Sequence, residues 1–410
     1  MLDCISYEVK AEKIILAKSL DRVCPSCSFE ARRLERRRRA WKPLARRFAN
    51  GFTLIPDAAR TVEVGRVEER AMTLRWVSAV AMATMMILPL AAHAADAPSA
   101  GPDATGPGYE YYVIGDVKAP TPGKTGPLLA LMGGGDWPLE AFQQFVKQSG
   151  GGHIVVLRAR GGRELQDEIY KDVGGVLSVE TLVIHNEDAG EDPKLLAIIA
   201  HADGIFFGGG DQSNYVRAWK GTALNKALDA HVKAGKPIGG TSAGLAVLGG
   251  YVYGCLDSIS ITSPMALKDP TGPSVTLVRD FLHLPYLSKV ITDTHFDKRD
   301  RQGRLVTFVG RLAQEENDPG IVGLGVDEDA AMLIDDKGIG RFYGPGHAWL
   351  IRPMAKPATI IAGQPLNYAT FPIVGIGPGS TLDFKTFQVT KPAFSLTASV
   401  KDGVLIRSDR

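Results

Sequence analysis

The sequence predicts an α/β fold, with a mostly parallel sheet that helices cover on both faces and a small β-rich C-terminal extension. From residue 128 onward, short apolar runs typical of buried strands alternate with stretches of helical length and polarity. Beyond residue 356 the helical stretches end, and alternating segments such as Phe394–Val400 predict strands. In folds with parallel strands, ligand and catalytic sites form at the carboxyl ends of the strands. The loops that follow the strands are therefore where chemistry is expected.

The elements follow one another closely along residues 128–355, which we expect to form one α/β domain. The expected strands are Leu128–Met132, His153–Leu157, Val176–Ile184, Gly204–Phe207, Lys289–Ile291 and Gly323–Val326. The expected helices are Pro138–Ser149, Arg163–Val173, Pro193–Ala202 and Asp211–Ala234, and Gly338–Arg352 is expected to form hairpins. Residues 95–127 are rich in Pro, Gly and Ala, which predicts a linker with one short strand at Tyr111–Ile114.

The N-terminal part of the chain has the pattern of a signal peptide at an unusual position. A positive start at Met72–Arg75 precedes the apolar stretch Trp76–Leu90, and Ala92-His-Ala94 supplies small residues for cleavage after Ala94. We therefore expect a secreted or periplasmic protein that retains no membrane span. Residues 1–71 are then an upstream over-extension of the reading frame; the alternative is a basic cytosolic tail before a membrane anchor. That alternative is disfavoured because the apolar stretch is shorter than the roughly 20 residues of a membrane-spanning helix.

Charge and cysteine content exclude several classes of protein. Of 47 Lys+Arg and 45 Asp+Glu, residues 1–71 hold 16 and 10, which leaves 31 basic and 35 acidic residues in the body of the chain. A mildly acidic body disfavours general nucleic-acid binding. Cys24 and Cys27 form a single C-x-x-C with no second pair, so no function is assigned to them. After cleavage only Cys255 remains, which permits no internal disulfide.

A strand, a sharp turn and a helix are expected around Ser242. Gly240–Gly244 reads G-T-S-A-G, after the apolar strand end Pro237-Ile238 and before the small apolar residues Leu245–Leu248. In this context the pattern G-x-S-x-G indicates a nucleophilic serine on a strained turn, with the Ala243 N–H facing an oxyanion. The alternative is a glycine-rich turn in which Ser242 only caps the helix.

Two other glycine-rich loops follow expected strands. Gly133–Gly135 suggests a dinucleotide site, but Pro138 occupies the position of the third glycine and no Walker lysine follows, so this interpretation is weak. The segment Gly208–Gln212 reads G-G-G-D-Q, in which glycines permit close approach to a ligand and Gln212 offers both a donor and an acceptor. The alternative for this segment is a tight turn into the next helix.

A further loop combines a histidine with several arginines. His295 lies two residues after Asp293 and is followed by Arg299, Arg301 and Arg304. This pattern suggests a base beside a site for carboxylates or other anions. The alternative is a solvated helix face on which Asp297 and Asp300 pair with the arginines.

An acidic cluster, Asp327-Glu-Asp329, follows the strand Gly323–Val326. One of its carboxylates could orient His295 as the third member of a nucleophile–base–acid set. The alternative is a solvated acidic turn.

Four stretches together resemble the cyanophycinase family of serine peptidases, which is related to the aspartyl dipeptidases and has a class I glutamine amidotransferase-like fold. The resemblance covers roughly Leu128–Met354. The matching stretches are F-F-G-G-G-D-Q at Phe206–Gln212, G-T-S-A-G at Gly240–Gly244, D-T-H-F-x-x-R-x-R-x-x-R-L at Asp293–Leu305 and G-L-G-V-D-E-D-A-A at Gly323–Ala331.

The resemblance implies a role for individual residues. Ser242 is the nucleophile, His295 the base and Glu328 the carboxylate, although Asp327 and Asp329 are adjacent alternatives. The oxyanion donors are the N–H groups of Ala243 and of the turn around Gly210. The residues implied in substrate binding are Gln212, Asp293, Thr294, Arg299, Arg301 and Arg304. Thr294 stands where cytosolic cyanophycinases often have Gln, which removes a long amide donor.

The resemblance also implies hydrolysis of cyanophycin, an arginyl-substituted poly-aspartate, to β-Asp-Arg dipeptides through an acyl-enzyme, without a cofactor or metal. Aspartyl or isoaspartyl dipeptide hydrolysis is the alternative within the family. An α/β-hydrolase would need the order Ser242, Asp327, His347, and His347 has no anion-binding group beside it. A glutamine amidotransferase would need Cys at position 242, and an exported binding protein would not need a reactive serine. A homodimer is left open.

Overall fold

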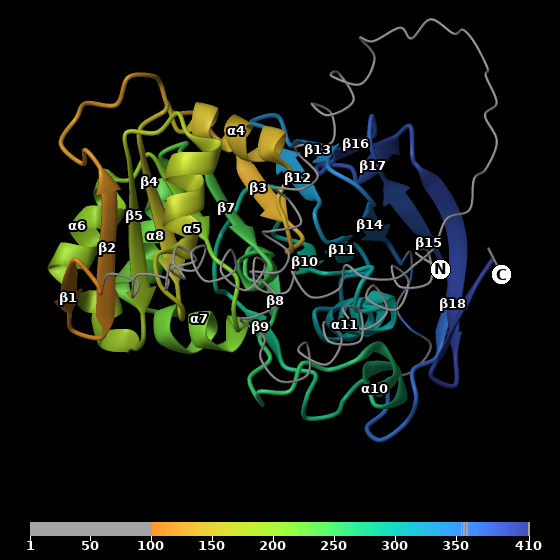
Figure 1. Cartoon of the computed structure of the whole chain (residues 1–410). Helices are drawn as coiled ribbons and strands as arrows, with labels where there is room; N and C mark the ends of the chain where they lie inside the picture. The colour runs from red at the N-terminus through yellow and green to blue at the C-terminus, as the bar shows by residue number, and fades with distance from the viewer. Residues whose placement is uncertain (1–100, 354, 356, 358–359, 409–410) are drawn as a thin grey trace, which may run out of the picture. The chain divides into compact units, whose positions relative to one another are not determined.

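The computed structural model describes residues 101–410 except 354, 356, 358–359 and 409–410 (Figure 1). The expected signal peptide and the segment before it lie outside the described residues. Within the described part of the chain, no helix has the length and apolar character needed to cross a membrane.

The strands form two large sheets (Figure 1). The first has eleven strands in the order β1-β2-β5-β4-β6-β7-β3-β12-β13-β16-β17, and the second has eight in the order β19-β18-β15-β14-β11-β10-β8-β9. The strands of the first sheet are β1 (Ala104–Gly106), β2 (Tyr109–Gly115), β3 (Leu129–Met132), β4 (His153–Arg158), β5 (Ser178–Ile184), β6 (Gly204–Phe207), β7 (Ile238–Thr241), β12 (Ala331–Ile334), β13 (Ile339–Tyr343), β16 (Thr381–Asp383) and β17 (Gln388–Thr390). Those of the second are β8 (Tyr251–Tyr253), β9 (Leu277–Arg279), β10 (Val290–Asp293), β11 (Val322–Val326), β14 (Ala348–Ile351), β15 (Tyr368–Ile376), β18 (Phe394–Lys401) and β19 (Val404–Arg407).

Both sheets are mixed, so the expectation of a mostly parallel sheet is wrong. Parallel pairing is confined to the run β5-β4-β6-β7-β3 in the first sheet and to β8-β10-β11 in the second. The remaining pairs are antiparallel, for example β12 with β13 and β14 with β15. Helices connect the strands of the parallel run. Short turns join the paired strands β12-β13, β16-β17 and β18-β19, and a short turn between neighbouring strands permits only antiparallel pairing.

Helices cover both faces of the first sheet, as expected. On one face, α4, α5 and the π-helical turn η1 pack on Ala130, Val156 and Phe206; on the other, α6, α7 and α8 pack on Leu131 and Phe207. The helices and helical turns are α4 (Leu139–Gln148), α5 (Glu164–Asp167), η1 (Glu168–Val173), η2 (Glu187–Glu191), α6 (Pro193–His201), α7 (Gln212–Trp219), α8 (Ala223–Lys233), α9 (Ala243–Ala246), α10 (Ser263–Lys268) and α11 (Gln302–Glu315). The single helix expected over Asp211–Ala234 is divided, since Gly221 (φ 82) ends α7 and Thr222 caps α8.

The ends of the described chain add strands to the sheets. The strand expected at Tyr111–Ile114 within the linker is part of β2, which pairs with β5 along Tyr109–Gly115, and β1 is a second strand that was not expected there. The C-terminal extension is rich in strands, as expected, and it continues both sheets: β15 pairs with β14, and β16 pairs with β13. The boundaries of the expected domains stay predictions.

The topology brings the carboxyl ends of β3, β6, β7, β10 and β11 together, and these strands come from both sheets. The loops after them are joined by backbone hydrogen bonds. The His295 N–H donates to the Gly133 carbonyl oxygen at 2.7 Å, and the Asp329 N–H donates to the Gly134 oxygen at 2.8 Å. The loop after β3 thus connects the loops after β10 and β11.

Candidate active site

Ser242 occupies a strained turn between β7 and α9. Its backbone has φ 55 and ψ −120, a conformation that non-glycine residues rarely adopt. No side chain fits at the two flanking glycines. A Cβ on Gly240 would come within 2.6 Å of Gly244 C, and a Cβ on Gly244 would come within 2.3 Å of the Phe207 oxygen. The strand–turn–helix context predicted for Ser242 is therefore present.

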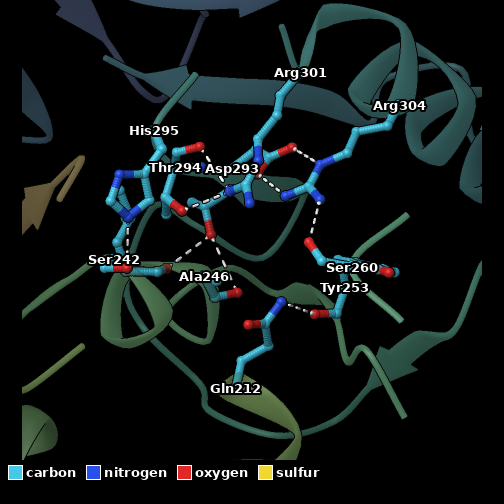
Figure 2. A network of polar contacts seen from close by, with 12 residues as sticks. Gln212, Ser242, Ala246, Tyr253, Ser260, Asp293, Thr294, His295, Arg301 and Arg304 are labelled. Atoms are coloured by element: carbon cyan, nitrogen blue, oxygen red, sulfur yellow. Dashed lines mark hydrogen bonds and ion pairs between the residues drawn. The ribbon is translucent and has the colours of Figure 1, made fainter. Parts of the chain in front are cut away.

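A continuous chain of hydrogen bonds links Ser242, His295 and Glu328. Ser242 Oγ lies 2.7 Å from His295 Nε2, a contact that Figure 2 shows, and His295 Nδ1 lies 2.6 Å from Glu328 Oε1. The carboxylate can only accept, so it fixes the tautomer in which Nδ1–H donates to Glu328 and Nε2 accepts the serine proton. The geometry suits activation of a serine hydroxyl by a neutral imidazole.

The glycine run after β3 shapes the position of the imidazole. Gly134 has φ 100, and a Cβ on it would lie 2.3 Å from His295 Cε1. His295 itself has φ 45. From the sequence, Gly133–Gly135 suggested only a weak dinucleotide site, and its contact with His295 was not expected. The signal available was a glycine run at a strand end.

The protonation of His295 is disfavoured by its surroundings. Burial lowers the pKa of the imidazole, and the positive charge of Arg299 lowers it further, while the hydrogen bond and charge of Glu328 oppose the shift. The ring is therefore neutral, and able to accept a proton, at the pH of the ordinary histidine pKa, and it becomes protonated only at lower pH.

Each carboxylate of the acidic cluster has a different partner. Glu328 holds His295, whereas Asp327 accepts from Trp349 Nε1 at 2.9 Å and from the His347 N–H at 2.8 Å. Asp329 Oδ1 accepts from the backbone N–H that follows Gly135 at 2.5 Å. Burial raises the pKa of Asp327. Of the three carboxylates that the sequence left open, Glu328 is therefore the one that contacts His295.

His347 is not connected to the serine. Its Nδ1 lies 4.0 Å from Asp327 Oδ2, and its ring packs edge-on against Trp349 and Phe394. The Ser–Asp–His order of an α/β-hydrolase is therefore not assembled here.

Asp293 is the centre of a buried ion cluster (Figure 2). Arg304 binds it with two nitrogens, Nε to Oδ2 at 2.8 Å and Nη2 to Oδ1 at 2.6 Å, and Arg301 Nη1 lies 3.3 Å from Oδ1. Arg301 Nη1 also donates to the oxygen and Oγ1 of Thr294 at 2.8 and 2.9 Å. Burial alone would raise the pKa of Asp293, but the charges of Arg304 and Arg301 outweigh it and lower that pKa.

This cluster changes the expected substrate contacts. Asp293 and Arg304 were expected to bind substrate, but they are only 1% and 2% exposed and form an ion pair with each other, so neither is open to a substrate. Thr294 and Arg301 are also buried. Arg299 is exposed, and Gln212 is half-buried with its Nε2 donating to the Tyr253 oxygen at 3.3 Å. The physical reason is that two buried guanidiniums need a carboxylate, and Asp293 supplies it.

The expected oxyanion donors lie beside the nucleophile. Ala243 follows Ser242 directly as the first residue of α9. In the turn after β6, a Cβ on Gly209 would lie 3.4 Å from Ser242 Cβ and 3.7 Å from its Oγ, and the next residue, Gly210, has φ 142. The structure therefore brings both expected donor segments to the serine.

Residues 164–341 match the description "Peptidase family S51". This segment is therefore similar to peptidase family S51. It contains Ser242, His295 and Glu328 together with the glycine turn after β6. The resemblance inferred from the four sequence stretches is confirmed, and the family together with the relatives below supports a serine-type peptidase.

Curated relatives extend the match. Cyanophycinases of Synechococcus elongatus and of Thermosynechococcus vestitus are each 30% identical over 230 residues, which is 55% of this chain and 66% of theirs. The chain thus spans just under two thirds of the length of these relatives. A solved peptidase from an acI-B1 Actinobacterium is 15% identical, with a TM-score of 0.43, and the alignment covers 64% of this chain and 98% of that one.

Proposed function

We propose that the protein is a serine exopeptidase that hydrolyses cyanophycin to β-Asp-Arg dipeptides through an acyl-enzyme on Ser242. The observation that carries this proposal is the hydrogen-bonded chain Ser242–His295–Glu328. The two cyanophycinase relatives support the choice of substrate. We also propose that the fold is of the class I glutamine amidotransferase-like type.

In the proposed first step, Ser242 Oγ attacks the backbone carbonyl carbon beside a β-Asp-Arg unit while His295 Nε2 takes the hydroxyl proton. Glu328 stabilises the imidazolium through Nδ1–H, and the N–H groups of Ala243 and Gly210 receive the oxyanion. The C–N bond then breaks, and the proton passes from Nε2 to the departing amine. Water, deprotonated by His295, hydrolyses the ester and regenerates the Ser242 hydroxyl.

A second candidate within the family is hydrolysis of short aspartyl or isoaspartyl peptides. A long arginyl poly-aspartate presents many charges, and three free arginines in the loop after β10 would favour it. Because Arg301 and Arg304 are instead committed to Asp293, that argument for the polymer is weakened. The dipeptidase is therefore kept as the alternative.

Incubation with insoluble cyanophycin, followed by mass analysis of the soluble products, tests the proposal. Release of a single product with the mass of Asp-Arg by the wild type, and none by Ser242→Ala, is the expected result. If the wild type leaves the polymer intact but cleaves Asp-X or isoaspartyl dipeptides, the second candidate replaces the first. Hydrolysis of neither substrate contradicts both.

We further propose that the protein is exported and begins at Ala95 after cleavage. The motive is the order of positive, apolar and small residues along Met72–Ala94. N-terminal sequencing of secreted protein should read A-D-A-P. Active protein that retains residues 1–71 would contradict the proposal.

A further inference from the structure

The turn after β6 is held from behind by a buried tyrosine. The side chain of Tyr215, on the first turns of α7, is fully buried, and its hydroxyl donates to the Gly208 carbonyl oxygen at 2.7 Å. The Gly209 oxygen lies 3.5 Å from the same hydroxyl. Burial raises the pKa of Tyr215, so the hydroxyl keeps its proton and remains a donor across the working pH range.

The hydrogen bond to Gly208 also determines where the next N–H points. In a trans peptide the C=O of one residue and the N–H of the next point in opposite directions within one plane. Once Tyr215 fixes the Gly208 oxygen on its own side, the Gly209 N–H points away from Tyr215. The longer contact to the Gly209 oxygen, at 3.5 Å, shares the same hydroxyl proton and constrains the Gly210 N–H less strictly.

Tyr215 thus orients the backbone N–H groups of Gly209 and Gly210, which make no hydrogen bond within the described part of the protein. The turn lies beside Ser242, where the Cβ position of Gly209 is 3.7 Å from Oγ. Its glycines carry no side chain that would hold the turn in place, and Gly210 has φ 142, so the turn needs an external support.

The phenol ring of Tyr215 is itself fixed by two aromatic neighbours. It lies parallel to Phe207, with centroids 6.3 Å apart, and edge-on to Trp219 at 4.5 Å. Phe207 is the last residue of β6, directly before the turn. The hydroxyl therefore has a defined position relative to the strand end that it supports.

We propose that Tyr215 is a positioning residue that orients the N–H groups of the Gly208–Gly210 turn toward the oxyanion formed at Ser242, an inference that rests on the proposed serine mechanism. It acts through the turn and does not touch substrate. Removing its hydroxyl should weaken binding of the transition state and leave binding of the ground state unchanged.

Tyr215→Phe is the direct test, because phenylalanine keeps both ring contacts and the variant is expected to fold. We expect kcat to fall about 10- to 100-fold, with KM within twofold of the wild type, since loss of a whole oxyanion donor costs about 10²–10³ in kcat. Tyr368→Phe is the matched control: Tyr368 is also buried and donates to the backbone oxygen of Ala355 at 2.9 Å, so it should keep the wild-type kcat.

A second readout does not depend on the peptide substrate. In reaction with a fluorophosphonate, Ser242 Oγ forms a P–O bond, fluoride leaves, His295 takes the proton, and the phosphoryl oxygen occupies the oxyanion position. We expect this rate to fall with kcat in Tyr215→Phe. Equal kcat and equal phosphonylation in Tyr215→Phe and Tyr368→Phe would overturn the inference, as would a rise in KM with kcat unchanged. A wild type that is phosphonylated but hydrolyses no peptide would overturn the proposed function only.

Discussion

At the scale of single residues, the site depends on how His295 is held between two oxygens. Ser242 Oγ and Glu328 Oε1 lie 2.7 and 2.6 Å from its two nitrogens, and the loop after β3 closes over the ring. This arrangement decides which proton the ring can accept and at what pH.

Glu328→Gln preserves the size of the side chain and removes its charge. Because an amide can offer either its oxygen or its NH₂ to Nδ1, the tautomer is no longer enforced and the imidazolium loses its counter-charge. We expect kcat to fall by roughly 10³–10⁴-fold, measured by steady-state hydrolysis. Asp329→Asn, one residue along, should stay within a few-fold of wild type. Comparable losses in the two variants would remove Glu328 from its proposed role.

Arg299→Gln tests the electrostatic control of His295. The positive charge of Arg299 contributes to the lowered pKa of the imidazole, so its removal should raise that pKa. Only neutral His295 accepts the serine proton, and activity is therefore lost as the pH falls through this pKa. The acid limb of the kcat/KM profile should lie below pH 6.5 in the wild type, which is about the ordinary histidine value, and move to higher pH in Arg299→Gln. Lys298→Gln is the control, and a profile that shifts equally in both variants would contradict the account.

Gly134→Ala tests the closeness of the loop to the ring. The added Cβ would lie 2.3 Å from His295 Cε1, so either the ring or the loop must move. We expect kcat to fall by more than about 100-fold, because small displacements of a catalytic group are costly. Gly174→Ala is the control for backbone strain alone, since Gly174 also has a positive φ (68) but has nothing within 4 Å of its Cβ position. Full activity in Gly134→Ala would show that the ring tolerates displacement.

At the scale of elements, the cluster of Asp293 with Arg301 and Arg304 fastens the end of β10 to the start of α11. His295 lies between these two elements. The cluster therefore fixes the direction in which the chain leaves β10 and enters the loop that carries the base. We therefore expect the ion cluster to affect activity only by positioning His295, since Asp293 itself is closed to solvent.

Asp293→Asn leaves two buried guanidiniums without a counter-charge. Removing one partner of a buried ion pair is strongly destabilising, and we expect the free energy of unfolding to fall by about 3–5 kcal/mol in chemical denaturation. Lys171→Ala, which breaks the exposed pair of Lys171 with Asp167 at 3.1 Å, should cost less than about 1 kcal/mol. A loss for Asp293→Asn no larger than that of the control would show that the cluster is not a structural clamp.

At the scale of the whole molecule, the sequence predicted the alternation of strands and helices and the loops that carry the site. It could do so because apolar runs, glycines and polar residues at strand ends are local signals. It could not predict that two sheets share the site, since pairings such as β12 with β3 in one sheet and β10 with β8 in the other join residues that are far apart in the chain. Nor could it show that Arg301 and Arg304 face Asp293, because a run of charges reads the same whether it faces water or a buried carboxylate.

Mass mapping of a fluorophosphonate adduct tests the central claim most directly. The protein is labelled at neutral pH, digested, and the adduct located by fragmentation. The account predicts one adduct, on Ser242, that is absent in Ser242→Ala and formed at a rate lowered by orders of magnitude in His295→Ala. No adduct on Ser242 in the folded wild type, or labelling that proceeds equally without His295, would contradict it.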